Sequence, residues 1–214
     1  MKIKICGMKY PENIEHLALL KPDFLGFIFY EKSKRFVGDN LLIKDLHIDK
    51  NTQKVGVFVN ASHEYILENI KKHDLDLVQL HGDETPDFCA YLFKQNIKIS
   101  KAFQVDEDFD FKILDVYKDV CSYFLFDTKT KHYGGSGRKF DWDILSGYDN
   151  EKPFFLSGGI DIDDAQNIKQ LKGLNIFAID INSKFEIEPG LKDVGKIGVF
   201  MEELRLNHNE ISVI

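Results

Sequence analysis

The sequence is poor in cysteine, lacks a long apolar run and has no excess of basic residues. Its three cysteines, Cys6, Cys89 and Cys121, are an odd number without paired spacing, so neither a disulfide framework nor a zinc cluster is indicated. No apolar stretch approaches the length of a membrane span, and the apolar run in MKIKICGM is too short for a signal peptide. The net charge of −7 argues against nucleic-acid binding, which needs clustered Lys and Arg. We therefore expect a cytoplasmic protein with no nucleic-acid or membrane partner.

Length and composition fit one globular domain. The chain has 214 residues, of which 43% are hydrophobic and 29% are charged, and these are ordinary proportions for a protein with a sizeable core. A single α/β barrel suits this length better than two small domains, so we expect one domain over residues 1–214. The acidic charge still allows a small anionic substrate, because local donors rather than the net charge would bind it.

A short apolar run followed by an amphipathic segment recurs along the chain. The eight runs are KIKIC (2–6), FLGFIF (24–29), KVGVFV (54–59), DLVQL (76–80), IKISKAF (97–103), YFLF (123–126), PFFL (153–156) and NIFAI (175–179). Between them stand helix-start signals at Pro11, at Asn60 or Ser62, at Thr85-Pro86, at Asp161 and at Asp193. Strands that alternate with helices imply parallel pairing with right-handed crossovers.

Eight such units in 214 residues fit an α/β fold of the (β/α)8 TIM barrel type. An open doubly wound sheet is the main alternative. A dinucleotide-binding sheet of that kind needs a glycine-rich turn after its first strand, and Cys6-Gly7-Met8 is not such a turn. The barrel is therefore our prediction.

Polar residues collect where the apolar runs end, and the starts of the same runs show no comparable set. In a barrel the carboxyl ends of the strands form the active-site face, so this asymmetry predicts a catalytic face. The residues are Cys6, Arg35, Asn60, His81, Asp127, Ser157-Gly158-Gly159, and Asp180 with Asn182 and Ser183.

Strand parity predicts which of these side chains point into the barrel. Side chains alternate across a strand, so Lys2, Lys4 and Cys6 share one face and the two isoleucines between them share the other. The apolar face should meet the helices, which directs Lys4 and Cys6 inward. A lysine inside a barrel needs a carboxylate partner or hydration, and we predict a carboxylate. The same count directs these residues inward: Gln79, His81, Tyr123, Leu125, Asp127, Ala178 and Asp180.

Each candidate also has a purely structural explanation. A cysteine that closes a strand is often a small buried hydrophobe, Asp127 can cap a turn, and His81 can bond a neighbouring backbone group. The pair Gly158-Gly159 is more specific, because it exposes backbone N–H groups at the end of the seventh strand, where barrels bind phosphate. We therefore predict a phosphate site at this pair.

Taken in order, the strand-end motifs resemble those of the phosphoribosylanthranilate isomerase family. The matching segments are KICGM (4–8), GFIFYEKSKR (26–35), VGVFVN (55–60), VQLHG (78–82), LFDTKTKHYGGSGRKFDW (125–142), LSGGI (156–160) and AIDINSKFE (178–186). The resemblance implies a TIM barrel that converts N-(5-phosphoribosyl)anthranilate to 1-(2-carboxyphenylamino)-1-deoxyribulose 5-phosphate. This reaction is an Amadori rearrangement in tryptophan biosynthesis, and it needs no metal, nicotinamide or other cofactor.

The resemblance also implies roles for individual residues. Cys6 matches the general base and Asp127 the general acid. Substrate contacts fall on Arg35, which matches the arginine that holds the anthranilate carboxylate, and on His81 and Asp180. Phosphate contacts fall on Gly158, Gly159, Asn182 and Ser183. An acid of this kind needs a raised pKa, and the base needs a cationic neighbour that favours its thiolate, for which Lys4 is a candidate.

Two further expectations concern loops. After the eighth strand the family pattern has a glycine where this chain has Lys184, and a positive φ there would be costly for lysine. The stretch Gly134-Gly135-Ser136-Gly137 suits a closing loop. The alternatives left open are another phosphosugar barrel enzyme and a non-catalytic barrel that binds a phosphorylated ligand. We expect a monomer, with a homodimer as the alternative.

Overall fold

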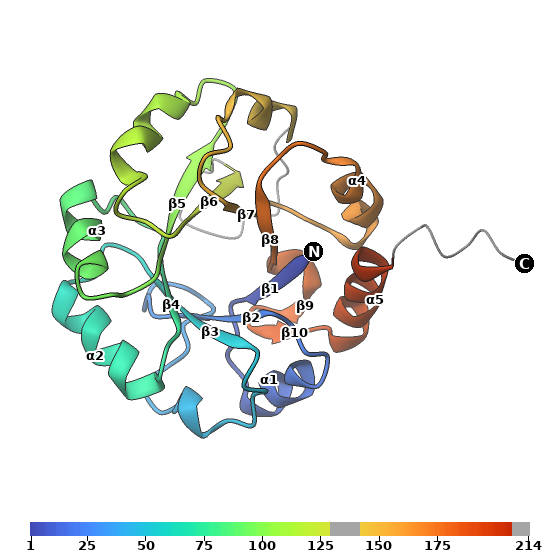
Figure 1. The fold of residues 1–214 in the computed structure, drawn as a ribbon. Helices are drawn as coiled ribbons and strands as arrows, with labels where there is room; N and C mark the ends of the chain where they lie inside the picture. The colour runs from blue at the N-terminus through green and yellow to red at the C-terminus, as the bar shows by residue number, and fades with distance from the viewer. Residues whose placement is uncertain (129–141, 207–214) are drawn as a thin grey trace, which may run out of the picture.

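The computed structural model describes residues 1–128 and 142–206, and its centre is a closed barrel of parallel strands ringed by helices (Figure 1). The strands are β1 (Lys2–Cys6), β2 (Phe24–Ile28), β3 (Gln53–Phe58), β4 (Leu77–Leu80), β5 (Ile99–Val105), β6 (Tyr123–Thr128), β7 (Phe154–Leu156) and β8 (Ile176–Ile181). Each strand pairs with the next, and β8 closes on β1. The predicted TIM barrel is confirmed, and every strand overlaps one of the eight apolar runs.

The segments between strands are α-helices in some places and short 3-10 helices in others. The α-helices are α1 (Pro11–Ala18), α2 (His63–His73), α3 (Pro86–Phe93), α4 (Ala165–Gln170) and α5 (Val194–Arg205). The 3-10 helices are η1 (Ile43–Asp45), η2 (Phe111–Tyr117), η3 (Trp142–Gly147), η4 (Ile162–Asp164) and η5 (Ser183–Phe185). Strands β2 and β5 are therefore followed by a 3-10 helix where the simple alternation predicts an α-helix.

The predicted helix starts agree with the caps in the structure. Pro11 is the first residue of α1. Ser62, rather than Asn60, caps α2 by accepting a hydrogen bond from the backbone N–H of Tyr65, which satisfies one of the free donors of the first turn. Thr85 caps α3 and Asp193 caps α5 in the same way, whereas Asp161 caps η4.

The inside of the barrel is apolar at the amino-terminal end and polar at the carboxyl end. The apolar plug consists of Phe24, Val55, Leu77, Ala102, Leu125, Phe155 and Ala178. Ile3 and Ile5 pack instead in the separate cluster between strands and helices. Leu125 and Ala178 thus point inward as parity predicts, and the next inward positions on their strands, Asp127 and Asp180, lie at the polar end.

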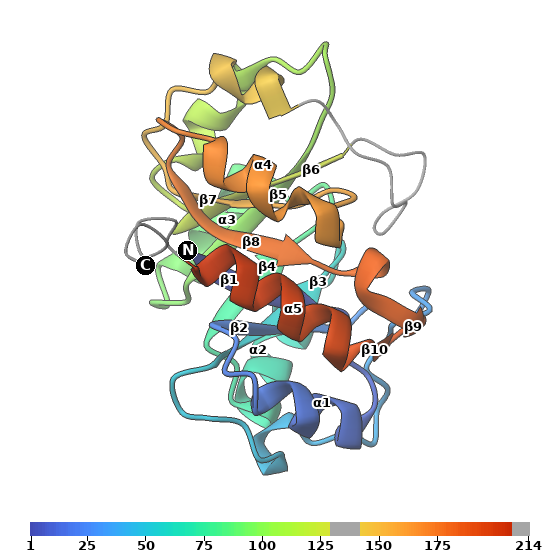
Figure 2. The same ribbon diagram turned by 90° about the vertical axis from the view of Figure 1, so that its right-hand side faces the viewer.

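An antiparallel hairpin follows the barrel's last strand, and the sequence patterns do not predict it. It consists of β9 (Glu186–Glu188) and β10 (Leu191–Lys192), joined at Gly190, whose φ of +91° suits glycine. Figure 2 shows the hairpin beyond the carboxyl end of β8, on the side of the barrel where the polar residues collect. Its position brings Glu186 and Lys192 to the site described below.

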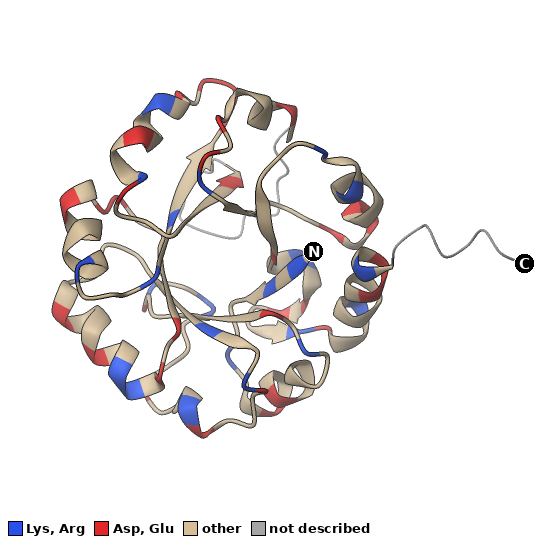
Figure 3. Cartoon of the chain, viewed as in Figure 1, with Lys and Arg blue, Asp and Glu red and all other residues tan. Residues whose placement is uncertain are grey.

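The outer surface carries charges of both signs. Lys, Arg, Asp and Glu are interspersed around the ring of helices (Figure 3). Among residues 1–128 and 142–206, no helix is long and apolar enough to cross a membrane. The loop expectation for Gly134-Gly135-Ser136-Gly137 lies outside the described residues.

Candidate active site

A buried ion pair inside the barrel joins β1 to β8. Lys4 Nζ donates hydrogen bonds of 3.0 and 2.9 Å to the two carboxylate oxygens of Asp180, and the two residues are opposite each other in the strand register. Lys4 is fully buried and Asp180 is 5% exposed. Burial alone would lower the pKa of Lys4, but the charges of Asp180 and Cys6 and the hydrogen bonds to them together raise that pKa above its usual value. The predicted carboxylate partner of Lys4 is confirmed.

Cys6 ends β1 next to this pair. Its neighbour on β2 is Gly26, where a Cβ atom would lie only 3.0 Å from Cys6 Sγ, so glycine leaves room for the thiol. Burial raises the pKa of Cys6, and the charges of Lys4 and Lys192 oppose this without offsetting it. The expected cationic neighbour is therefore present, whereas burial of the thiol opposes the thiolate that the base needs.

A line of polar side chains runs from Gln79 through His81 to Asp127. Gln79 Nε2 lies 2.8 Å from His81 Nδ1, and His81 Nε2 lies 3.5 Å from Asp127 Oδ2. Asp127 Oδ1 accepts a 2.8 Å hydrogen bond from the backbone N–H of Thr128. With the amide nitrogen of Gln79 as a donor, a neutral imidazole carries its proton on Nε2, the atom that lies near Asp127 without a hydrogen bond in the described part of the chain.

The two halves of the site face each other across the barrel. The charge of Asp127 acts on Asp180, and Asp180 is bonded to Lys4 beside Cys6. The predicted acid and the predicted base therefore lie on opposite sides of one buried polar layer. Sequence reasoning missed Gln104, which pairs with Asp127 in the register of β5 and β6. The predicted run stopped at Phe103, whereas β5 continues to Val105.

Arg35 lies in a second charged cluster, formed with the hairpin. Its guanidinium bonds both oxygens of Glu186, at 2.8 and 3.0 Å from Nε and 2.6 Å from Nη2. Lys192 Nζ donates to Glu186 Oε1 and to Asn182 Oδ1, both at 2.7 Å. Burial alone would raise the pKa of Glu186, but Arg35 and Lys192 hold that pKa below its usual range. Sequence reasoning gave no role to Glu186, although it ends the motif AIDINSKFE, and it missed Lys192, which lies outside the matching motifs.

The predicted phosphate residues lie at the ends of β7 and β8. Gly158 and Gly159 have φ values of +97° and +65°, a conformation that favours glycine. Within the described part of the chain, their backbone N–H groups have no hydrogen-bond acceptor. A Cβ on Gly158 would collide with Thr128 Oγ1 and would lie 3.2 Å from Asp127 Oδ1. This glycine therefore lets the end of β7 come close to Asp127.

The loop after β8 differs from the expectation in one respect. Lys192 already holds Asn182 Oδ1, so only the amide nitrogen of Asn182 and its backbone could serve a ligand. Ser183 begins η5 and is partly exposed. Lys184 is exposed and is not among the residues with positive φ, so the replacement of glycine by lysine imposes no left-handed strain.

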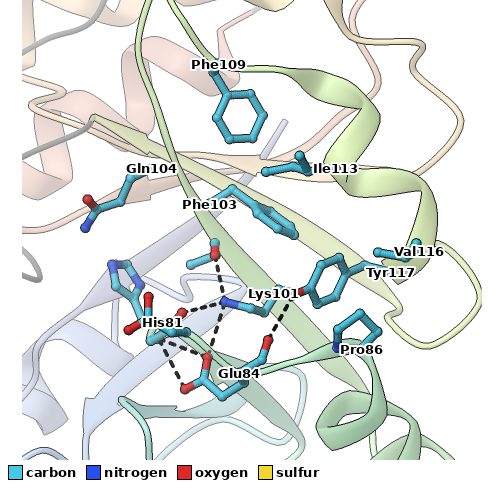
Figure 4. Close-up of a pocket in the computed structure, with 13 residues that line it drawn as sticks. His81, Glu84, Pro86, Lys101, Phe103, Gln104, Phe109, Ile113, Val116 and Tyr117 are labelled. Atoms are coloured by element: carbon cyan, nitrogen blue, oxygen red, sulfur yellow. Dashed lines mark hydrogen bonds and ion pairs between the residues drawn. The ribbon is translucent and has the colours of Figure 1, made fainter.

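A cavity of about 820 Å³ lies beside the polar layer, and His81 and Gln104 are among the residues that line it. One wall carries Lys101, whose Nζ bonds the backbone oxygens of Gly82 and Ala102 and lies 3.2 Å from Glu84 Oε2 (Figure 4). Phe103, Phe109, Ile113, Val116 and Tyr117 form the apolar part. Because this lysine is fully satisfied and Cys6 does not line the cavity, we place the candidate active site at the polar layer instead.

Comparisons with known proteins identify the family of this chain. The family described as N-(5'phosphoribosyl)anthranilate (PRA) isomerase matches residues 3–203. The N-(5'-phosphoribosyl)anthranilate isomerase of Parabacteroides distasonis is 45% identical over 95% of this chain and 93% of its own. The crystal structure of phosphoribosyl anthranilate isomerase from Thermotoga maritima superposes with a TM-score of 0.81, at 31% identity, over 95% of this chain and 98% of its own.

A further crystal structure of phosphoribosyl anthranilate isomerase was solved in complex with reduced 1-(o-carboxyphenylamino)-1-deoxyribulose 5-phosphate. It superposes with a TM-score of 0.79, at 28% identity, over 95% of this chain and 98% of its own. Both the sequence matches and the structural matches extend over nearly the whole chain. The chain therefore belongs to the N-(5'-phosphoribosyl)anthranilate isomerase family.

Proposed function

We propose that this chain catalyses the isomerisation of N-(5-phosphoribosyl)anthranilate to 1-(2-carboxyphenylamino)-1-deoxyribulose 5-phosphate in tryptophan biosynthesis. The observation that carries the proposal is that Cys6 and Asp127 lie at the carboxyl ends of β1 and β6, with the buried Lys4–Asp180 pair beside them. Family membership supports it, and so does the complex of a family member with a reduced form of the same product.

Each end of the substrate has a matching group in the site. The backbone N–H groups of Gly158 and Gly159, with those of the loop at Asn182 and Ser183, are suited to the phosphate. The guanidinium of Arg35 is suited to the anthranilate carboxylate. Anchors at both ends would hold the sugar carbon C2′ between the acid and the base.

The chemistry then needs two proton transfers with the protein, followed by a tautomerisation in which C1′ gains a proton and the C2′ hydroxyl loses one, and it needs no external oxidant. Asp127 in its protonated form gives a proton to the ring oxygen of the furanose, and the ring opens to a Schiff base. Cys6 as thiolate removes the proton from C2′, which gives an enolamine, and this tautomerises to the ketone. His81 Nε2–H lies beside Asp127, so it stabilises the carboxylate that remains after the first transfer. Lys4 and Lys192 stabilise the thiolate.

A direct assay tests the proposal. Purified protein is mixed with freshly made phosphoribosylanthranilate, and the loss of anthranilate fluorescence is followed against spontaneous decay. We expect clear acceleration by the wild type, almost none by Cys6→Ala or Asp127→Asn, and near wild-type rates for the matched control Cys89→Ala, whose buried thiol belongs to α3. No acceleration by the wild type would instead favour another phosphosugar reaction or a binding protein.

Location and assembly belong to the same proposal. We expect the enzyme to act in the cytoplasm, where its three free thiols stay reduced. We also expect a monomer, because the exposed large apolar side chains are scattered over several helices. Sedimentation that gives twice the mass of 24.8 kDa would support the homodimer instead.

A further inference from the structure

The hairpin after β8 brings a carboxylate against an arginine that the proposed function assigns to the substrate. Glu186 meets the side of the Arg35 guanidinium that carries Nε and one N–H of Nη2. A guanidinium has five N–H donors, and three of them remain: both on Nη1 and one on Nη2. Within residues 1–128 and 142–206, no acceptor meets these three. They form the end of the fork, where a second carboxylate can bind in bidentate fashion.

The carboxylate that holds Arg35 is itself fixed from three directions. Glu186 Oε1 accepts hydrogen bonds from Lys192 Nζ at 2.7 Å and from the backbone N–H of Gly190 at 3.0 Å, in addition to Arg35 Nε at 2.8 Å. The Glu186 side chain is 4% exposed and that of Lys192 is fully buried. A carboxylate with so many donors has little freedom to turn, so Arg35 has little freedom as well.

The charges of this cluster leave room for one anionic group. Arg35 and Lys192 contribute two positive charges and Glu186 one negative charge, so the buried cluster carries one net positive charge. A substrate carboxylate would neutralise it. If Glu186 were absent, two adjacent cations would remain, and Arg35 would have no partner to define its orientation.

The cluster also lies close to Cys6, the proposed general base. The aliphatic part of Arg35 crosses Gly7, the residue that follows Cys6, where a Cβ atom would lie 2.7 Å from Arg35 Cδ and 2.9 Å from Asn182 Oδ1. Gly7 therefore allows Arg35 and the loop that leads to the hairpin to meet over the end of β1. A rotation of the guanidinium here would move the bound carboxylate relative to the thiol.

We propose that Glu186 is a positioning residue for Arg35: it occupies the Nε side of the guanidinium and turns the remaining N–H pair toward the substrate carboxylate. Lys192 and the turn at Gly190 keep Glu186 in place. This inference rests on the proposed function, since it takes the anthranilate carboxylate as the ligand of Arg35. It also gives the hairpin β9–β10 a role in the reaction.

The test compares two substrates on Glu186→Gln, which keeps the shape of the side chain and removes its charge. With phosphoribosylanthranilate we expect kcat/KM to fall about 10- to 100-fold, because a misplaced substrate loses alignment with the base. With the analogue made from aniline, which lacks the carboxylate, we expect variant and wild type to agree within about threefold. In an Arg35→Met background the Glu186→Gln change should likewise have little effect.

Controls separate positioning from folding. Glu188→Gln changes an exposed carboxylate on the same hairpin, bonded only to the hydroxyl of Tyr10 among the described contacts, and should leave both rates unchanged. Circular dichroism and urea unfolding verify that each variant is folded. If Glu186→Gln does not fold, Glu186→Asp applies the same test, because it keeps the charge and shortens its reach to Arg35.

Several results would overturn the inference. An unchanged rate for Glu186→Gln with phosphoribosylanthranilate would do so, and so would an equal loss with both substrates or in both backgrounds. If the wild type shows no turnover, the proposed function fails first, and the inference is decided by titration calorimetry with the reduced product. If Glu186→Gln weakens binding of the reduced product but not of the same ligand without its carboxylate, positioning is supported. Equal binding of the reduced product to variant and wild type, or no binding to the wild type, refutes it.

Discussion

Removal of the Lys4 ammonium should destabilise the barrel strongly. Lys4→Met keeps most of the side-chain volume but leaves the Asp180 carboxylate, 5% exposed, without its cation. Breaking a buried ion pair from one side costs about 3–5 kcal/mol, because an uncompensated charge stays in the interior. The double variant Lys4→Met with Asp180→Asn buries an unpaired amide instead, which costs roughly 1–3 kcal/mol. The double variant should therefore be more stable than the single one, by about 2 kcal/mol.

Urea unfolding followed by circular dichroism measures these differences, and pH gives a second test of their origin. Without the cation, the pKa of Asp180 in the folded variant rises further above its value in the unfolded chain, about 3.9. A raised folded pKa contributes stability that is present below the unfolded pKa and is lost as the pH rises. The deficit of Lys4→Met relative to wild type should thus be smallest near pH 4 and grow toward neutrality. A deficit under about 1 kcal/mol at neutral pH, or a double variant as unstable as the single one, would refute the reasoning.

Three further predictions concern the chemistry. Because burial raises the pKa of Cys6 and only the thiolate reacts with alkylating agents, the rate at which iodoacetamide modifies Cys6 should rise about tenfold per pH unit from neutral toward alkaline pH; a rate independent of pH would contradict the raised pKa. Gln79→Glu replaces a donor to Nδ1 of His81 by an acceptor, so 15N NMR should show the imidazole proton moving to Nδ1. Gln79→Met is the control, and an unchanged tautomer in Gln79→Glu would contradict the assigned hydrogen bond. Gly158→Ala adds a Cβ at a φ of +97°, a strain of roughly 1–3 kcal/mol that should raise KM; an unchanged KM would separate this turn from phosphate binding.

The strands and their inward faces could be predicted because both depend on local alternation. A period of two along KIKIC is enough to direct Lys4 inward, and a lysine in that position requires a carboxylate wherever the remaining strands lie. The partner itself, Asp180, is 176 residues away. It was nevertheless within reach of prediction, because β8 must close on β1 in an eight-stranded barrel.

The hairpin and its contacts could not be predicted in this way. Its strands have three and two residues, which is too short for an alternating pattern to be recognised. The contact between Arg35 and Glu186 joins positions 151 residues apart, one in the loop after β2 and one at the start of the hairpin. The path of such connections depends on packing rather than on periodicity. Gln104 was missed for a simpler reason, since β5 continues past the last apolar residue of its run.

Cys6 has one cationic neighbour in the barrel, Lys4, and one in the hairpin, Lys192. Lys4 approaches the thiol from the barrel interior, but its charge is already matched by Asp180 at 2.9 Å. Lys192 comes from the hairpin, where Glu186 must also serve Arg35. Burial lowers the pKa of Lys192 to about 8, so it is still mostly protonated at neutral pH. The uncompensated positive charge that favours the thiolate therefore comes from the hairpin side. A carboxylate bound to Arg35 would cancel part of that charge, so proton removal by Cys6 has to draw on substrate alignment as well as on charge.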